Sequence, residues 1–189
     1  PVKPRNTSAD DNPIIISTHK NMNLYFAVGY SEIGKIIRIA LPQKNEESAI
    51  LEIAKYYPEF LVSDQYSNTA KMLSDIYHGK NVDVKLEILD FKKSTINTSF
   101  EMDVILEVAK IPYGNLTTYK EIAKTLNTQA YRAVGTAIGK NPFPILIPCH
   151  RVIRSDGKIG DFQGGTSMKI EILKNEGIKI NNRKIMNIL

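Results

Sequence analysis

Residues 144–152 read Pro-Ile-Leu-Ile-Pro-Cys-His-Arg-Val, and Cys149 within this segment is the only cysteine among the 189 residues. A chain with one cysteine forms no intrachain disulfide and no cysteine-rich zinc site, so its core must come from apolar packing. The segment itself leaves two interpretations open. Cys149 is either a buried structural cysteine or a nucleophile whose thiolate is favoured by the neighbouring His150 and Arg151.

The composition is that of an ordinary globular protein, with 42% hydrophobic and 24% charged residues. The length allows one or two domains, each with its own core. Because no stretch approaches the ~18 apolar residues of a membrane span, no membrane association is expected. The single cysteine fits a reducing intracellular compartment, and the scattered histidines predict no metal site. The polar residues 1–12 predict a flexible leader.

The positive charge is concentrated in the second half of the chain. Residues 1–100 hold 12 basic and 12 acidic side chains, whereas residues 101–189 hold 13 and 8, which accounts for the net charge of +5. Within residues 110–158 the balance is 8 basic against 2 acidic. Such an excess attracts polyanions such as nucleic acid, although a solvated basic surface is the simpler alternative.

The first half predicts a small α/β region over residues 13–91. Apolar and β-branched runs predict a hairpin of strands at 23–30 and 35–41, an earlier strand at 14–17 and a later one at 82–89, where apolar residues alternate. Helices are expected at 46–56 and 68–77. The polar residues 92–97 are typical of a linker.

The second half predicts helices with clear start signals. Thr98 with Glu101, and Thr118 with Glu121, form capping boxes. The second box opens a helix of about ten residues, followed by another helix over 129–140. Two short helices joined by a tight turn on a basic chain are typical of a helix-turn-helix, although any small domain can contain such a pair. A last helix is expected over 168–176, capped by Thr166 or Ser167 and ended by Gly177.

Two further features have alternative interpretations. The helix over 129–140 carries small residues that allow either a close approach to a DNA minor groove or close packing on another helix; they are Ala130, Ala133, Gly135, Thr136, Ala137 and Gly139. The glycine-rich loop 160–165 suits a phosphate or the close passage of the chain beside a flat ligand.

Taken together and in order, these segments resemble the O6-alkylguanine-DNA alkyltransferases. The matching segments are Ile111-Pro-Tyr-Gly114, Thr118-Tyr119, Arg132-Ala-Val-Gly135, Asn141-Pro142, Pro148-Cys-His-Arg-Val152, the loop 160–165 and Asn175-Glu-Gly177. The resemblance is close from Thr98 to Gly177, whereas the first 97 residues match only in size and order of elements.

The resemblance implies an α/β protein of two domains. Residues 13–91 would form a ribonuclease H-like α/β domain, and residues 98–180 a mainly helical domain with the helix-turn-helix and the active site. It implies suicide transfer of an alkyl group from O6 of guanine, or O4 of thymine, in duplex DNA to a cysteine of the protein. The protein would bind the DNA minor groove as a monomer without a cofactor, in the cytoplasm or, in a eukaryote, the nucleus.

The resemblance also implies roles for individual residues. Cys149 would accept the alkyl group, His150 would take its proton through a water with Glu176 orienting the imidazole, and Asn141 would hold the turn that presents Cys149. Tyr119 would crowd the phosphate and donate to the guanine, and Arg132 would fill the space left by the flipped nucleotide. The remaining implied residues contact DNA (Ala130, Ala133, Gly135 and Arg151) or line the substrate pocket (Val152, Phe162, Gln163 and Gly164).

The chain departs from the family pattern at the glycine-rich loop. Relatives often carry Tyr and either Ser or Arg where this chain has Phe162 and Gln163. This leaves open the preference among alkyl groups and between guanine and thymine lesions. Two other functions compete with alkyl transfer. A lesion-binding relative without transfer would lack Cys149, and a transcription factor would read the major groove with large polar side chains, which the small residues of the 129–140 helix do not provide.

Overall fold

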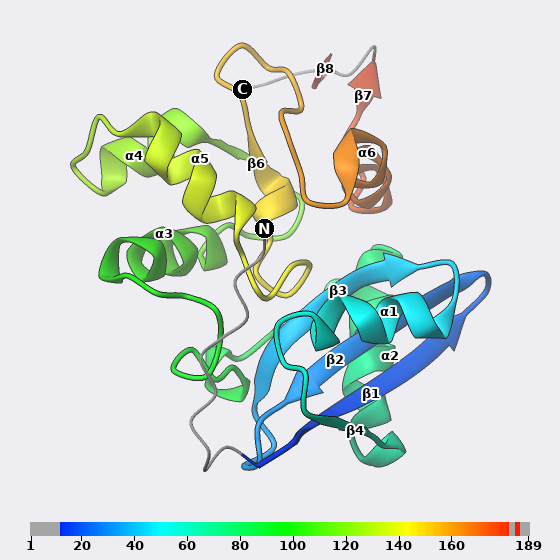
Figure 1. Ribbon diagram of the computed structural model, residues 1–189. Coiled ribbons are helices and arrows are strands. Elements are labelled where there is room, and N and C mark those ends of the chain that lie inside the picture. Colours follow the sequence, from blue (N-terminus) through cyan, green and yellow to red (C-terminus); the bar gives the residue numbers. More distant parts are fainter. Residues whose placement is uncertain (1–11, 182–183, 186–189) are drawn as a thin grey trace. The chain divides into compact units, whose positions relative to one another are not determined.

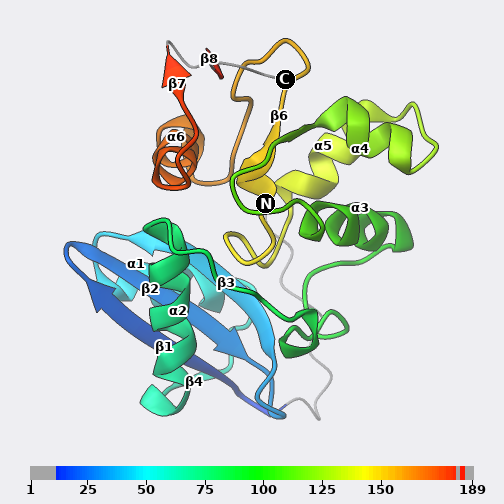
Figure 2. The same cartoon turned by 180° about the vertical axis from the view of Figure 1, so that it is seen from behind.

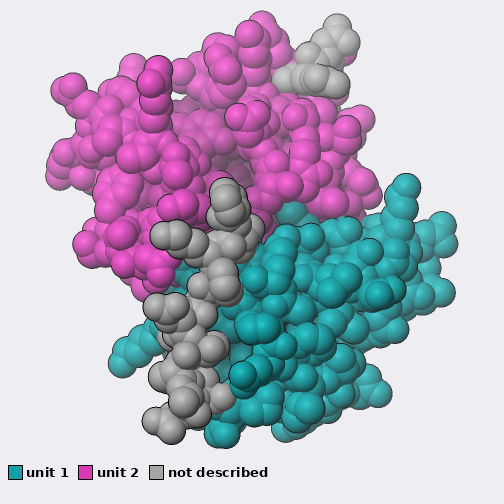
Figure 3. All heavy atoms as spheres, in the orientation of Figure 1, with its two compact units in different colours: residues 1–75, 83–95 teal, residues 76–82, 96–189 magenta. Residues whose placement is uncertain are grey.

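The computed structural model describes residues 12–181 and 184–185, so the predicted flexible leader lies outside the described residues except for Asn12. The chain divides into two compact units, drawn in teal and magenta in Figure 3. The first unit comprises the described residues up to Asp75 together with Asp83–Thr95. The second comprises Ile76–Val82 and the chain from Ile96 onward.

A four-stranded sheet forms the centre of the first unit, in the order β3-β2-β1-β4. Strands β1 (Ile14–Asn21), β2 (Leu24–Tyr30) and β3 (Ile36–Gln43) form an antiparallel meander, as the predicted hairpin requires. The short strand β4 (Phe60–Val62) pairs parallel to the start of β1. The sequence analysis missed β4 because three residues are too few for an alternating pattern.

Two helices cover the sheet of the first unit. Helix α1 (Glu46–Ala54) crosses one face in Figure 1, and α2 (Ser67–Tyr77) crosses the opposite face in the reverse view of Figure 2. Under α1 the core is mainly aliphatic and includes Ile16, Ile37 and Ile53. On the other side Asn21 Nδ2 donates to Ser74 Oγ of α2 at 2.8 Å. With both faces covered, the central strand β2 is buried over its last five residues.

The strand predicted over residues 82–89 is wrong. This segment is extended only in part, ends in the 3₁₀ turn η2 (Leu86–Ile88), and meets β3 at the single bridge between Leu89 and Ile36. Alternating burial along 82–86 explains the pattern in the sequence, because alternation reports which side chains are covered and not whether a strand pairs. Residues 76–82 group with the second unit, where Asn175 Nδ2 donates to Tyr77 O and Tyr113 Oη to Gly79 O.

Three helices, α3 (Ser99–Ala109), α4 (Tyr119–Thr125) and α5 (Tyr131–Gly139), pack against one another in the second unit. Both predicted capping boxes begin a helix, because Thr98 Oγ1 accepts from Glu101 N and Thr118 Oγ1 from Glu121 N, each at 3.1 Å. Helices α4 and α5 are shorter than expected and are joined by residues 126–130.

The rest of the second unit is built from very short elements. Strands β5 (Thr117–Thr118) and β6 (Val152–Ile153) pair in parallel, and the 3₁₀ turn η3 (Cys149–Arg151) leads directly into β6. Helix α6 (Gly165–Asn175) is followed by Gly177 in the left-handed conformation, as predicted. Its N-cap is Gly164 without a side-chain bond, so the predicted caps Thr166 and Ser167 lie inside the helix. The hairpin β7 (Ile180–Asn181) and β8 (Lys184–Ile185) completes the described chain.

Candidate active site

Cys149 lies in a rigid turn at the start of η3 and is only 3% exposed. The turn is fixed by the fully buried Asn141, whose Nδ2 donates to Ile147 O and whose Oδ1 accepts from Phe143 N, both at 3.0 Å. Within it the buried Ile145 has a φ of 74°, which a β-branched side chain rarely adopts. Since such a conformation persists only where the surroundings impose it, the position of Cys149 is strongly determined.

Replacing Asn141 with alanine is therefore expected to destabilise the fold. The variant removes two buried hydrogen bonds, to Ile147 O and from Phe143 N, each contributing about 0.5–1.5 kcal/mol. Urea denaturation measures the loss, and Asn115→Ala, which truncates an exposed asparagine, serves as the control with a change within about 0.5 kcal/mol. Equal stability of the two variants would contradict the assigned role of Asn141.

Behind Cys149 lies a buried network of His150, Arg151 and Glu176. His150 Nε2 is 2.9 Å from Glu176 Oε1, and the Arg151 guanidinium donates to both oxygens of the same carboxylate at 2.8–3.1 Å. Arg151 Nη1 also donates to Ile111 O at 2.7 Å. With its nitrogens engaged inside the unit, Arg151 is not available to a phosphate, which argues against its predicted DNA contact.

The protonation states of this network follow from its burial. Burial lowers the pKa of His150, opposed by its bond to Glu176, so the imidazole is neutral at pH 7. The hydrogen bonds from His150 and Arg151 outweigh burial at Glu176 and lower its pKa to about 2. A neutral imidazole that donates Nε2–H to Glu176 leaves Nδ1 as an acceptor, and Nδ1 is the one buried side-chain polar atom without a hydrogen-bond partner among the described residues.

The expected activation of Cys149 by two neighbouring cations is wrong. Burial raises the pKa of the Cys149 thiol, with Asn141 and Lys169 acting in the opposite direction. His150 is neutral, and the charge of Arg151 is compensated by Glu176. The resting sulfur is therefore a thiol that needs a base, and the unpartnered Nδ1 of His150 is the available one.

A cavity of about 960 Å³ connects Cys149 to solvent. The predicted site residues that line it are Cys149, Tyr119, Arg132, Gly135, Phe162 and Gln163. The cavity is lined by Tyr119, Tyr131, Arg132, Gly135, Thr136, Ile138, Gly139, Cys149, Arg154, Gly160, Asp161, Phe162 and Gln163. Its volume is that of a small-molecule site and accommodates a purine base.

Tyr119 reaches this cavity because the β5–β6 pair aligns two chain segments. Thr118 pairs with Ile153, so the next residues, Tyr119 and Arg154, emerge at the same end of the pair. A Cβ on Gly160 would lie 3.4 Å from the Tyr119 ring, and the glycine thus allows the ring its close position. Burial, reinforced by Asp161, raises the pKa of Tyr119 to about 12, so its hydroxyl remains a donor.

The glycine-rich loop contributes four residues to the cavity lining, of which Gly160 and Asp161 were not predicted. Phe162 and Gln163 line the cavity, and Gln163 Nε2 donates to Asn141 O at 2.8 Å, which ties the loop to the Cys149 turn. Val152 is fully buried in β6, and Gly164 is the N-cap of α6; neither is among the cavity-lining residues. Both positions help to build the backbone of the site, and their contact with a substrate stays a prediction.

The predicted small-residue surface is present on α5 in part. Ala130, Ala133, Thr136 and Gly139 are exposed, whereas Ala137 is buried. The side chain of Arg132 is exposed beside them and borders the cavity. The missed residue is Tyr131, an aromatic that is 48% exposed on the same helix.

Lys169 is a second residue that the sequence analysis missed. It is fully buried, donates to Val152 O at 2.6 Å and to Asp161 O at 3.3 Å, and has its pKa lowered by burial to about 8. A detectable signal existed, since Lys169, Ile172, Leu173 and Glu176 follow one another at helical spacing. A lysine and a glutamate on an apolar stripe indicate that the helix faces a polar interior.

Within residues 12–181 and 184–185, no group of three or more His, Cys, Asp or Glu side chains is arranged to hold a metal ion. The same residues contain no helix that is both long and apolar enough to cross a lipid bilayer.

Comparison with known proteins identifies relatives of this chain. Residues 99–178 match the family model of the 6-O-methylguanine DNA methyltransferase DNA-binding domain. A methylated-DNA–protein-cysteine methyltransferase from Methanosarcina barkeri is 42% identical over 112 residues, covering 59% of this chain and 68% of that protein. Its counterpart from Metallosphaera sedula is 37% identical over 141 residues, covering 74% of this chain and 86% of that protein.

Solved structures agree with this assignment. The chain is similar to Mycobacterium tuberculosis OGT in complex with DNA, with a TM-score of 0.66, 25% identity, and 86% of this chain and 92% of that chain covered. The O6-methylguanine-DNA methyltransferase of the archaeon Pyrococcus kodakaraensis has a TM-score of 0.65 and 25% identity, covering 87% and 99%. These neighbours share its α/β fold, and the chain belongs to the methylated-DNA–protein-cysteine methyltransferase family.

Proposed function

We propose that this protein is a DNA repair enzyme that transfers an alkyl group from O6 of guanine in DNA to Sγ of Cys149 and is consumed in the reaction. The observation that carries the proposal is that the only thiol of the chain lines an open cavity and is followed in the same turn by His150, whose buried Nδ1 has no hydrogen-bond partner among the described residues. The names of the relatives support the same reaction.

Base flipping delivers the lesion to Cys149. The thiol lines the cavity and is only 3% exposed, so a base that remains stacked in a duplex does not reach it. The exposed small residues of α5 favour close approach of this helix to the minor groove, with α4 and α5 as a helix-turn-helix. Arg132 borders the cavity mouth and is suited to occupy the space that the flipped nucleotide leaves in the stack.

The transfer is a displacement at the alkyl carbon. The thiol proton moves through a water to Nδ1 of His150, and the imidazolium that forms is stabilised by the Glu176 carboxylate. Sγ forms a bond to the carbon as the bond from carbon to O6 breaks, and O6 keeps the electron pair. The Tyr119 hydroxyl, still protonated at neutral pH, is positioned to donate to the guanine as charge develops on it.

The product is a thioether, which no group in the site can cleave, so each molecule acts once. Two alternatives are less well supported. A lesion-binding protein without transfer has no use for a thiol beside a base, and a transcription factor that reads the major groove needs polar side chains where α5 has Ala130 and Ala133.

The finer architecture is also part of this proposal. The order β3-β2-β1-β4, with β4 parallel to β1 after α1, supports a ribonuclease H-like arrangement of residues 13–91. Residues 98–180 would then be the alkyltransferase domain. The partner would be duplex DNA bound in the minor groove by a monomer, in keeping with the 8 basic and 2 acidic residues within 110–158.

Intact-mass spectrometry tests the reaction directly. The protein is mixed with a duplex oligonucleotide that carries O6-methylguanine, and we expect a gain of one methyl group in place of one hydrogen, located on Cys149 by peptide mapping. An unmodified duplex is the control. Recovery of unmodified protein together with intact lesion would overturn the proposed function.

Arg132→Ala is expected to slow transfer from duplex DNA more than transfer from a free base. Extruding a nucleotide costs a few kcal/mol, so loss of the residue that fills the gap should lower the duplex rate by roughly 10²-fold. Free O6-benzylguanine needs no flipping and should react with nearly the parental rate if the pocket admits it. Equal losses with both substrates would contradict the role of Arg132 in extrusion.

Ala133→Trp should block duplex binding without harming the reactive site. Ala133 is exposed on α5, so the fold tolerates the larger side chain, but an indole prevents close approach to a groove about 6 Å wide. Fluorescence anisotropy with a labelled duplex measures binding, and Asn115→Trp provides an equally bulky control outside α4 and α5. A folded Ala133→Trp variant that repairs duplex DNA at the parental rate would show that α5 does not face the DNA.

A further inference from the structure

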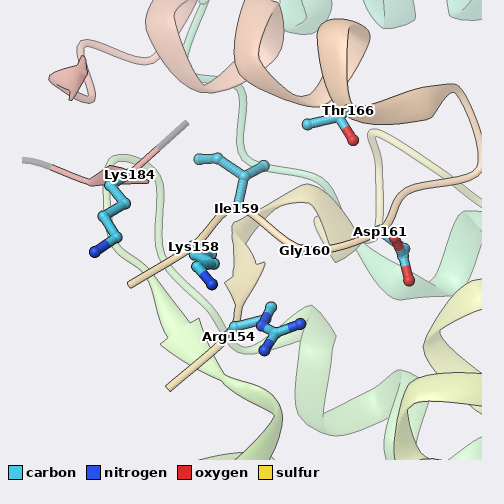
Figure 4. A pocket seen from close by; sticks show the side chains of 7 residues that line it. All are labelled: Arg154, Lys158, Ile159, Gly160, Asp161, Thr166 and Lys184. Atoms are coloured by element: carbon cyan, nitrogen blue, oxygen red, sulfur yellow. The ribbon is translucent and has the colours of Figure 1, made fainter. Parts of the chain in front are cut away.

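A second cavity, of about 340 Å³, lies in the same unit and has a basic lining. Figure 4 shows Arg154, Lys158 and Lys184 around it, with Asp161 at the end away from the two lysines. Its other lining residues are Ile159, Gly160 and Thr166. The proposed alkyl transfer makes no use of Lys158 or Lys184.

The two lysines are held next to each other by the backbone. Lys158 and Lys184 are partners in an antiparallel bridge, and Ile185 N donates to Gly157 O at 3.1 Å beside it. Residues directly opposite in such a bridge project to the same side, and like charges in this position destabilise the pairing. The two ammonium groups repel each other in the free protein, and an anion bound between them would remove this repulsion.

Nearby acidic groups compensate the charge only in part. Asp156 accepts from Arg154 at 3.3 Å and lies 3.5 Å from Lys158 Nζ, and Asp161 is the one acidic residue in the lining. No ion pair to Lys184 occurs within the described residues. The first turn of α6, which has no side-chain cap, contributes Thr166 to the lining and adds the positive end of a helix dipole.

The position of this cavity indicates the source of the anion. Arg154, Gly160 and Asp161 line both this cavity and the one that contains Cys149, so the two are neighbours within the unit. A nucleotide with its base at Cys149 carries its own phosphates just outside the base cavity. We infer that Arg154, Lys158 and Lys184 bind a backbone phosphate of the DNA strand that carries the flipped nucleotide, an inference that rests on the proposed function.

Neutral phosphate replacements give the sharpest test. Methylphosphonates are introduced one at a time around the lesion, and duplex affinity is measured for the parent and for Lys158→Gln/Lys184→Gln. A methylphosphonate at one position should lower the affinity of the parent by roughly five- to tenfold. The double variant should bind the unmodified duplex more weakly than the parent by the same factor, and the methylphosphonate at that position should not weaken its binding further. The slope of log affinity against log salt should fall in magnitude by about 1 in the double variant.

Two controls separate this contact from general electrostatics and from a role in folding. Lys174→Gln removes one exposed charge from the far end of α6 and should leave the methylphosphonate profile unchanged. Lys184→Gln alone should not lower the melting temperature of the DNA-free protein at low salt, because it removes a repulsion. A profile that is the same in the parent and the double variant would overturn the inference.

The remaining outcomes are also distinguishable. If inorganic phosphate raises the melting temperature of the parent but not of the double variant, while both bind duplex DNA equally, the cavity is a site for free anions and the inference is wrong. Methylation of Cys149 by the parent is read separately by mass. If Cys149 is methylated but the methylphosphonate profile is the same in the parent and the double variant, only this inference is overturned. If the profiles differ as expected but Cys149 is not methylated, only the proposed reaction is overturned.

Discussion

Cys149→Ala is expected to reduce alkyl transfer to the background of a reaction without protein while leaving lesion recognition largely intact. Cys149 is the only thiol of the chain, so no other side chain can form a neutral thioether with the transferred alkyl group. The side chain is 3% exposed, so its truncation leaves only a small void in the cavity wall. The fold and the DNA-binding surface of α5 should therefore persist.

Two readouts separate chemistry from binding in this experiment. Transfer is followed by intact mass, and affinity for a lesion-bearing duplex by anisotropy at one fixed salt concentration. Cys149→Ser keeps the size of the side chain but presents a hydroxyl, a much weaker nucleophile that His150 alone does not activate for attack on an alkyl carbon. Transfer by either variant at a rate near that of the parent would exclude Cys149 as the acceptor.

Local chemistry explains which elements the sequence predicted well. The capping boxes at Thr98 and Thr118 involve atoms within four residues, and both begin helices at the expected positions. The hairpin of β2 and β3 likewise follows from adjacent runs of β-branched residues. Strands β4, β5 and β6 contain two or three residues each, too few for any periodicity, and their pairing depends on partners remote in the sequence.

The site illustrates a different limit of sequence reasoning. Adjacency in the chain suggested that His150 and Arg151 act on Cys149 as cations, but the 3₁₀ turn directs both toward Glu176, 25–26 residues away. Burial then reverses the expected direction of the pKa at Cys149. Helical spacing on α6 would have revealed Lys169, whereas the positions of Val152 in β6 and Gly164 at the start of α6 depend on backbone geometry that no local pattern encodes.

His150→Gln is expected to slow transfer by roughly 10²-fold or more at neutral pH. Because burial raises the pKa of Cys149, little thiolate exists without a base, and His150 Nδ1 is the unpartnered acceptor behind it. Glutamine can still donate to Glu176 but cannot take a proton. His19→Gln, in the first unit, is the matched control and should transfer at the parental rate.

The pH profile distinguishes loss of a base from loss of structure. In His150→Gln the rate depends on thiolate formed without help, so it should rise about tenfold per pH unit up to the raised pKa of Cys149. The parent, whose imidazole is already neutral at pH 7, should change little over the same range. A variant that remains equally slow at every pH has a distorted site, and one within twofold of the parent at pH 7 excludes His150 as the base.

The stability of the fold should respond to the same residue. The pKa of His150 is lowered in the folded state, so below pH 6.5 the unfolded chain binds a proton that the folded chain does not, and stability falls as pH falls. The pKa of Glu176 is lowered to about 2, so its contribution is present above about 4.5 and is lost only between 4.5 and 2. Between pH 7 and 5 the melting temperature of the parent should therefore fall more steeply than that of His150→Gln.

Glu176→Gln should slow transfer as His150→Gln does. Because this variant leaves the charge of the buried Arg151 uncompensated, it should also lower the free energy of unfolding by about 3–5 kcal/mol. Arg151→Met/Glu176→Gln removes that unpaired charge, so it should recover stability but not the transfer rate; recovery of both would exclude Glu176 from the proton relay.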